Sequence, residues 1–183
     1  MRRFLPLSLI LVGLTACAPW VNVGGYYEAT RHNFTVDLPE GWMRLNTPKY
    51  VLVTRDGVLL QNIVIRRWQC DEKLQHTKKE FRKDMLPQEV AEVLLDDTSC
   101  DPAVLNFALI ENVPAEAKAF LGSRIVFTFK NKDGLQMKSV CYAFMQGNWV
   151  YSIRYTAPVR HYFDKDIETF EKMVQTFKLI GRA

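Results

Sequence analysis

Three histidines supply the side chains that most often bind metal ions or transfer protons near neutral pH. His32, His76 and His161 lie far apart, and none stands at helical spacing from another histidine or beside a Cys-x-x-Cys pair. Zinc sites depend on such spacing, because it brings two ligands together in one helix face or turn. The chain also contains no Gly-x-Ser-x-Gly elbow and no glycine-rich phosphate loop. We therefore predict no metal site, no cofactor and no catalytic residues.

Two adjacent arginines are the clearest candidates for a binding site. Arg66 and Arg67 lie in an apolar run that resembles a strand, and adjacent strand residues point to opposite faces of a sheet. At least one of them is expected against a covered surface, where a charge needs a partner. Both are candidate anion or ligand contacts, and a structural ion pair is the alternative.

The N-terminus has the layout of an export signal. Arg2 and Arg3 form a basic start, residues 4–14 are mostly apolar, and small residues precede Cys17. The apolar run is about half of the roughly 20 residues that cross a bilayer, so we expect it to be cleaved rather than retained. Residues 14–17 resemble the lipidation signal of bacterial lipoproteins. The resemblance implies that Cys17 is the lipidation site, where acyl chains such as palmitate would anchor the chain to a membrane. An ordinary secretory signal is the alternative.

The lipoprotein resemblance implies a periplasm-facing position in the cell envelope. Ala18 replaces the aspartate that often marks inner-membrane retention, which favours the outer membrane. We expect a signal peptide over 1–16, a lipidated N-terminus and tether over 17–31, and one domain over 32–183. Loss of the two signal arginines lowers the formal charge from +4 to +2, so the charge gives no case for nucleic-acid binding.

Three cysteines remain in the exported body. Cys70 and Cys100 each follow a predicted element in polar surroundings, and disulfides persist outside the cytosol, so we predict that they form a bridge. In the loop-entropy model, such a bridge would stabilise the fold by roughly 3 to 4 kcal/mol. Cys141 lies inside a strand pattern and is expected to be a buried free thiol, with a redox role as the alternative.

Alternating and β-branched runs predict a mainly antiparallel sheet. The expected strands cover residues 34–38, 50–54, 58–68, 107–112, 123–130, 135–145 and 149–156. Short Gly-containing turns join the last three into a meander. A turn at Pro39 should end the first strand, and an irregular link should pass through Pro114. Trp149, Tyr151 and Tyr155 share one face of the last strand, where core packing is expected and a ligand groove is the alternative.

Helical spacing predicts three helices, over 72–85, 88–96 and 163–177, with Pro87 in the first turn of the second. The basic run 78–83 would be a solvated helix face or, alternatively, a surface for anionic lipid head groups. Helices that bury apolar stripes against an antiparallel sheet define the α+β class. We therefore expect a central antiparallel β-sheet flanked by helices.

Short motifs in two segments, residues 34–42 and residues 151–178, resemble the PsbP-like family, which includes small bacterial lipoproteins of the DcrB type. Residues 34–42 read Phe-x-Val-x-x-Pro-x-Gly-Trp, residues 151–158 read Tyr-x-Ile-x-Tyr-x-Ala-Pro, and residues 170–178 read Phe-x-x-Met-Val-x-x-Phe-Lys. The resemblance implies the same sheet with flanking helices and no shared catalytic constellation. Members serve as membrane-associated assembly factors, extrinsic subunits or envelope proteins.

The leading hypothesis is a lipid-anchored envelope protein that binds, or assists assembly of, a membrane-associated protein complex without catalysis. The first alternative is a small-ligand or lipid-binding module with a cleft near Arg66 or Arg67. An apolar-walled cavity with converging polar groups would favour that alternative. A hydrolytic or redox enzyme is the third hypothesis, with Cys141 as its main redox candidate.

Overall fold

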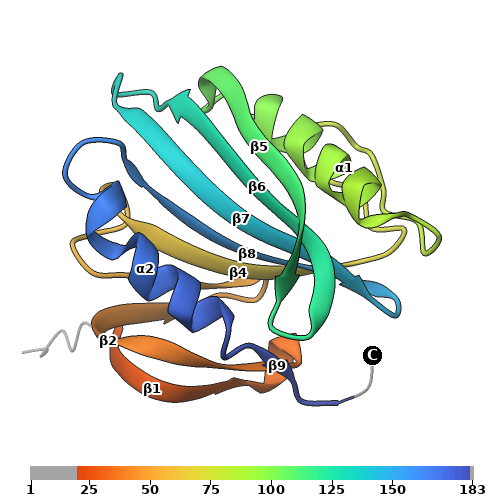
Figure 1. The fold of residues 1–183 in the computed structure, drawn as a ribbon, viewed down its shortest axis with the longest axis horizontal. Helices are drawn as coiled ribbons and strands as arrows, with labels where there is room; N and C mark the ends of the chain where they lie inside the picture. The colour runs from red at the N-terminus through yellow and green to blue at the C-terminus, as the bar shows by residue number, and fades with distance from the viewer. Residues whose placement is uncertain (1–19, 182–183) are drawn as a thin grey trace, which may run out of the picture.

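The computed structural model describes residues 20–181, which form one antiparallel sheet with a helix on each face (Figure 1). The strand order is β1-β2-β3-β4-β8-β7-β6-β5, and the short β9 pairs with β2 outside this path. The strands are β1 Val21–Ala29, β2 Phe34–Asn46, β3 Tyr50–Thr54, β4 Asn62–Gln69, β5 Leu105–Ala117, β6 Phe120–Lys130, β7 Gln136–Gln146, β8 Trp149–Pro158 and β9 Lys178–Leu179. The helices are α1, Pro87–Ser99, and α2, Phe163–Val174, and a short 3-10 turn covers Thr30–His32. This confirms the predicted α+β class.

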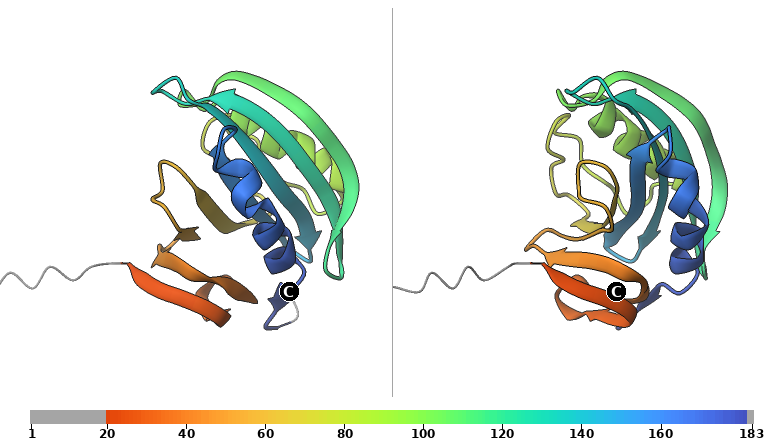
Figure 2. Two further views of the ribbon diagram at one scale, coloured as in Figure 1. Left: turned by 60° about the vertical axis from the view of Figure 1, so that its left-hand side comes forward. Right: turned by 90° about the vertical axis from the view of Figure 1, so that its left-hand side faces the viewer.

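The two helices pack on opposite faces of the sheet (Figure 2). Side chains alternate along β7, so neighbouring residues of that strand meet different helices. The ring of Tyr142 lies 6.2 Å from the ring of Phe170 in α2. Cys141 and Ala143, on the other face, join a cluster with Leu95 of α1. The apolar stripe of each helix therefore has its own side of the sheet.

The α2 face of the sheet is the main aromatic core. Tyr151 and Tyr155 are fully buried, and their rings stack on Phe144 and Phe170 at centroid distances of 5.4 Å and 5.6 Å. Aromatic rings of this size contribute large buried areas and favour stacked or edge-to-face pairs. The predicted packing role of the aromatic residues on β8 is confirmed for these two tyrosines.

Helix α1 begins where the sequence predicts, with Pro87 in its first turn. The carboxylate of Glu89 accepts a hydrogen bond from the Leu86 backbone N–H at 2.7 Å, which satisfies one of the free amides at the helix start. The helix lies against β5, β6 and β7. It therefore covers only part of its face of the sheet, although Val90 in its first turns joins a buried cluster with Trp68 of β4 and Val150 of β8.

The predicted tether is wrong over most of its length, because β1 occupies Val21–Ala29 and pairs along β2. The strand pattern is hidden in the sequence by a register shift between Val23 and Gly25, where Gly25 has a φ of 76°. The domain thus begins before residue 32. The predicted signal, Cys17 and Ala18 lie outside the described residues.

The segment predicted as a helix over 72–85 is an irregular loop. Lys78 has a φ of 60°, which an α-helix cannot accommodate. Leu74 and Phe81 are nevertheless buried, and the Phe81 ring lies 5.9 Å from that of Trp68. The apolar spacing therefore marks real core residues, but a folded loop buries them.

Two strands, β2 and β5, extend far beyond their predicted bounds. Strand β2 continues past the expected turn at Pro39, because Gly41 takes a φ of 73° and lets the chain bend without leaving the sheet. Strand β5 continues through Pro114 instead of giving way to an irregular link. Proline is compatible with this strand because β5 lies at the edge of the sheet, where one side of its backbone needs no partner.

Candidate functional site

The part of the sheet that α1 leaves uncovered forms a groove of about 560 Å³, within the usual range for small-ligand sites. Strands β3, β4, β7 and β8 supply its floor, and β6 adds Ile125, Phe127 and Phe129 along one side. One wall comes from the second half of α1 and the loop that follows it, and the opposite wall comes from the loop between β3 and β4, through Val58 and Leu59. We refer to this hollow as the α1-side groove.

Two arginines lie side by side on the floor of the groove. Arg66 of β4 pairs with Ser152 of β8, and Val64 pairs with Arg154, so the two guanidinium groups come from diagonal positions on neighbouring strands. The Arg66 guanidinium lies 4.5 Å from the centroid of the Trp68 ring, which holds it over the floor. Burial lowers the pKa of Arg66 below its ordinary value.

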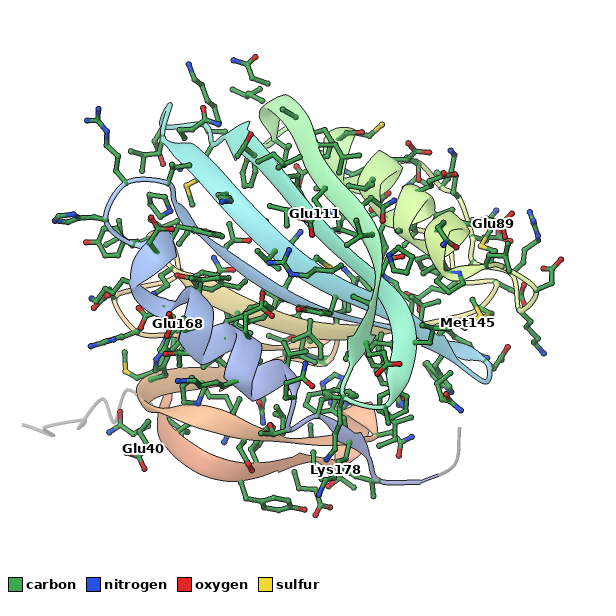
Figure 3. All side chains as sticks on the ribbon, viewed as in Figure 1. Glu40, Glu89, Glu111, Met145, Glu168 and Lys178 are labelled. Carbon is green, nitrogen blue, oxygen red and sulfur yellow. The ribbon has the colours of Figure 1, made fainter. Side chains whose placement is uncertain are left out.

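Within residues 20–181, neither guanidinium takes part in an ion pair or a hydrogen bond. Arg124, on the opposite face, shows the contrast. It contacts Glu111 of β5 at 2.7 Å and Glu171 of α2 at 2.9 Å (Figure 3 labels Glu111). Half-buried arginines usually gain such partners. Glu72 and Asp97 act on Arg66 only through longer-range attraction, which raises its pKa against the effect of burial. The groove therefore holds two guanidinium groups that form no direct ion pair with the described residues.

The two aspartates on the groove wall are already engaged. Asp97 accepts hydrogen bonds from the backbone N–H groups of His76 and Thr77 at 2.8 Å and 2.9 Å. Burial alone would raise the pKa of Asp97, but these hydrogen bonds outweigh it and the net shift is downward. Asp101 accepts from the Ala103 N–H at 2.8 Å and lies 3.7 Å from the His76 ring. The hydrogen bonds of both carboxylates are thus made within the wall.

Apolar side chains form much of the remaining lining, and a few polar groups converge among them. The apolar residues that line the groove are Leu52, Val58, Leu59, Val64, Trp68, Leu94, Leu95, Ala103, Val104, Ile125, Phe127, Phe129 and Met137. The hydroxyls of Ser152 and Thr156 lie on the floor, and Thr156 shares a 2.7 Å hydrogen bond with Ser139. Apolar walls around convergent polar groups are the usual composition of a ligand site.

Of the two predicted arginines, the structure places only Arg66 in the groove. Arg67 points to the other face, where its guanidinium stacks 4.0 Å from the Trp149 ring and donates to the Arg31 carbonyl at 2.9 Å. Its contacts are structural. Arg154 was missed, because no local pattern reveals that β8 pairs with β4 and brings the two arginines together.

The predicted bridge between Cys70 and Cys100 is absent from the structure, in which both thiols are free. Cys70 is buried in a cluster that includes Val90, a residue in the first turns of α1. Cys100 is exposed and follows the last turn of that helix. Val90, beside Cys70, and Cys100 are ten residues apart along the helix, which corresponds to about 15 Å. This distance is far beyond the reach of a disulfide. Cys141 is free and buried at the groove floor, and burial raises its pKa to about 11.

The histidines and acids do not gather into a metal site within residues 20–181, where no cluster of three potential ligands occurs. His32 is buried near Thr47, and His76 lies on the groove wall beside Asp101. Across the same residues, neither helix has the length and apolar character needed to cross a bilayer.

Solved structures of other proteins share the fold of this chain. Cyanobacterial PsbP (CyanoP) from Synechocystis sp. PCC 6803 matches with a TM-score of 0.60 at 9% identity, over 91% of this chain and 96% of that chain. The Ran-binding protein Mog1p of Saccharomyces cerevisiae matches with a TM-score of 0.57 at 10% identity, over 87% and 97% of the two chains. A protein from Bacteroides thetaiotaomicron VPI-5482 matches with a TM-score of 0.51 at 12% identity, and the match covers 85% of this chain but only 48% of that one.

No family model matches the chain, and no curated protein is similar to it in sequence. At such low identities the structural likeness establishes the fold alone. The chain therefore has the PsbP/Mog1-like fold.

Proposed function

We propose that this chain is a lipid-anchored, non-catalytic binding protein of the bacterial cell envelope that holds a small ligand in the α1-side groove. The observation that carries the ligand is the groove itself, where the unpaired Arg66 and Arg154 meet apolar walls. The N-terminal signal supports the anchor at Cys17, with a periplasm-facing domain and the outer membrane as the favoured site.

The interior of the groove favours binding over catalysis. The Cys141 thiol, the only cysteine in its lining, is buried with a pKa raised to about 11, so its nucleophilic thiolate form is suppressed. His76, the one histidine in the lining, lies beside Asp101 on the wall. The groove can therefore bind a ligand through its arginines and apolar walls, but Cys141 and His76 do not form a pair of nucleophile and base within it.

Native mass spectrometry of the protein purified from envelope membranes tests this proposal. We expect a small molecule to remain bound to the wild type. Ser152→Phe, which projects a ring into the groove floor, should remove it, and Ser152→Ala should retain it. Ser152 has no side-chain hydrogen bond within the described residues, so neither change breaks a polar contact. Absence of any bound molecule from correctly folded wild-type protein would count against the proposal.

A second candidate function is the binding of a membrane-associated protein complex, and the edge strand β5 favours it. Leu105, Leu109, Ile110 and Val113 are exposed along this strand, whose outer side has no neighbouring strand among the described residues. Exposed apolar edges of this kind are suited to pairing with another chain. The fold is also that of a protein described as Ran-binding.

Affinity capture from detergent-solubilised envelope, compared between wild type and Ile110→Lys, separates the two candidates. A partner that is lost with Ile110→Lys but kept with Ser152→Phe would support protein binding through β5. The same partner recovered equally from both variants and the wild type would exclude that edge as its binding surface.

A further inference from the structure

The α1-side groove has a charged part and an apolar part, and their arrangement restricts its ligand. Arg66 and Arg154 are the only arginines in its lining, and no lysine lines it. Guanidinium groups are planar donors that bind carboxylate or phosphate oxygens in pairs. The wall aspartates accept their hydrogen bonds from the wall and form no ion pair with either arginine, so the donor groups of both guanidiniums are available to an external anion.

Hydroxyl donors lie next to both arginines. Ser152 stands directly opposite Arg66 across the strand pair, and Thr156 lies two residues beyond Arg154 on the same face of β8. A carboxylate or phosphate placed between the guanidinium groups would thus have hydroxyl groups on either side along the floor. The stacking of Arg66 on Trp68 holds one guanidinium in place before the ligand arrives, which reduces the entropy lost on binding.

Apolar surface continues from this floor to the mouth of the groove. Phe127, Phe129 and Met137 line one side, and Leu59 forms part of the opposite lip. Leu59 is 73% exposed, more than any other large hydrophobic residue in the described part of the chain. An exposed leucine at the entrance of an apolar-walled groove is suited to contact a hydrocarbon tail.

From these features we infer that the ligand is a single-chain lipid with an anionic head group, held by Arg66 and Arg154 while its chain lies along Phe127, Phe129 and Leu59. This inference rests on the proposed ligand-binding function and adds the chemistry and the orientation of the ligand. A sugar would leave the two guanidinium charges without a counter-ion, and a cationic amphiphile would be repelled by them.

Calorimetric titration with three twelve-carbon probes tests the inference. The protein is the full chain carrying Cys17→Ser, which prevents acylation. Dodecanoate and dodecyl phosphate carry the anionic head, and dodecyl maltoside carries a neutral one, each used below the concentration at which it forms micelles. We expect both anionic probes to bind, and dodecyl maltoside to bind about tenfold or more weakly, as the loss of charge-assisted hydrogen bonds predicts.

Substitutions assign the contact to the two arginines. Arg66→Gln and Arg154→Gln should each weaken dodecanoate binding about tenfold or more, and Arg66→Lys should recover part of the loss because it keeps the charge. Arg160→Gln, at an exposed position outside the groove, is the matched control and should change affinity less than about twofold. Circular dichroism melting of each variant confirms that it is folded.

Two results would overturn the inference while leaving the groove as a binding site. One is equal affinity for dodecanoate and dodecyl maltoside with both lost in Ser152→Phe. The other is dodecanoate affinity that is unchanged in folded Arg66→Gln and Arg154→Gln. Failure of the proposed function gives a different pattern, in which none of the probes binds and no molecule accompanies the protein from its membrane.

Discussion

At the scale of the residue, the proposed role of Arg66 and Arg154 in binding would come at the expense of stability. A half-buried guanidinium without an acidic partner loses hydration and gains little from the protein. Elsewhere in the molecule such a group has a partner, as when the half-buried Arg124 contacts Glu171 at 2.9 Å. Residues kept in a destabilising arrangement are typical of functional sites, where stability and activity conflict.

This conflict predicts that Arg154→Met stabilises the protein while it weakens the ligand site. We expect the free energy of unfolding to rise by about 0.5 to 2 kcal/mol, since an apolar chain of similar length replaces a charge without a direct ion pair. Urea denaturation measures the change. Arg160→Met, at an exposed position, should stay within about 0.5 kcal/mol of wild type. A clear loss of stability in Arg154→Met would mean that the guanidinium has a structural partner in solution.

His32 gives the fold a pH dependence. Burial lowers the pKa of this histidine, and the nearby Arg67 and Arg31 add to the shift. An unfolded histidine has a pKa near 6.5, so the unfolded chain takes up the proton first as pH falls. The contribution of neutral His32 to the free energy of unfolding is therefore fully present above about pH 6.5 and decreases as the pH falls below it.

The measurement is the urea midpoint at pH 7.5 and at pH 5. The decrease between the two should be smaller in His32→Gln, whose amide can still donate to the Thr47 carbonyl that lies 3.3 Å from the His32 ring. His161→Gln, at an exposed position, is the control and should keep the wild-type decrease. An identical pH response in wild type and His32→Gln would contradict the assignment.

At the scale of the element, the α2 face depends on a close approach between β6 and β7. Gly122 of β6 pairs with Phe144, and a Cβ atom at position 122 would collide with the Ala143 carbonyl oxygen and come within 2.8 Å of the Phe144 Cβ. The two atoms that the new Cβ would meet are the Ala143 carbonyl oxygen and the Phe144 Cβ. Neither atom can move aside unless strand β7 shifts. The glycine therefore sets how tightly the meander packs.

Gly122→Ala should destabilise the fold by about 1 to 3 kcal/mol, the usual cost of overpacking. Thermal melting measures it as a lower Tm. Gly24→Ala is the matched control, because the nearest atom to its added methyl is the flexible Glu40 Cγ at 3.1 Å. Equal Tm values for Gly122→Ala and wild type would mean that the strands can separate there at little cost.

The elements differ in how well the sequence predicts them. The meander β6-β7-β8 and helix α2 follow from local alternation, turn residues and helical spacing, which act over short distances. The sequence pattern does not predict strand β1, because Gly24 and Gly25 interrupt the alternation of its side chains. The same kind of pattern predicts a helix around Lys78, because Leu74 and Phe81 have helical spacing, whereas the structure has a loop there. In both cases long-range packing decides a conformation that local propensity leaves open.

At the scale of the whole molecule, the groove lies where α1, which packs on β5, β6 and β7, leaves part of its face of the sheet uncovered. Its floor brings together β3 and β4, which are consecutive in the sequence, with β8, which lies much later in the chain. Arg66 could be singled out from the sequence because its strand was recognised, but its partnership with Arg154 depends on the register between β4 and β8. Strand order and register are long-range properties, so that half of the site required the structure.

The proposed anchor completes the account, since it would hold the groove beside the lipids from which a ligand could come. Cys17→Ser should move the protein from the membrane fraction to the soluble periplasmic fraction, because acyl chains supply the membrane affinity. Mass spectrometry of the wild-type N-terminus should find an acylated Cys17, and Ala18→Asp tests the outer-membrane preference by its fractionation. An unmodified Cys17 in the wild type would remove the anchor from the proposal.

The most direct test of the central claim is a crystal structure of the chain with dodecanoate. The account predicts a carboxylate within hydrogen-bond distance of both the Arg66 and Arg154 guanidinium groups, with the hydrocarbon chain along Phe127 and Phe129 toward Leu59. A dodecanoate bound elsewhere, or one whose carboxylate points to solvent while its chain lies over the two arginines, would contradict it.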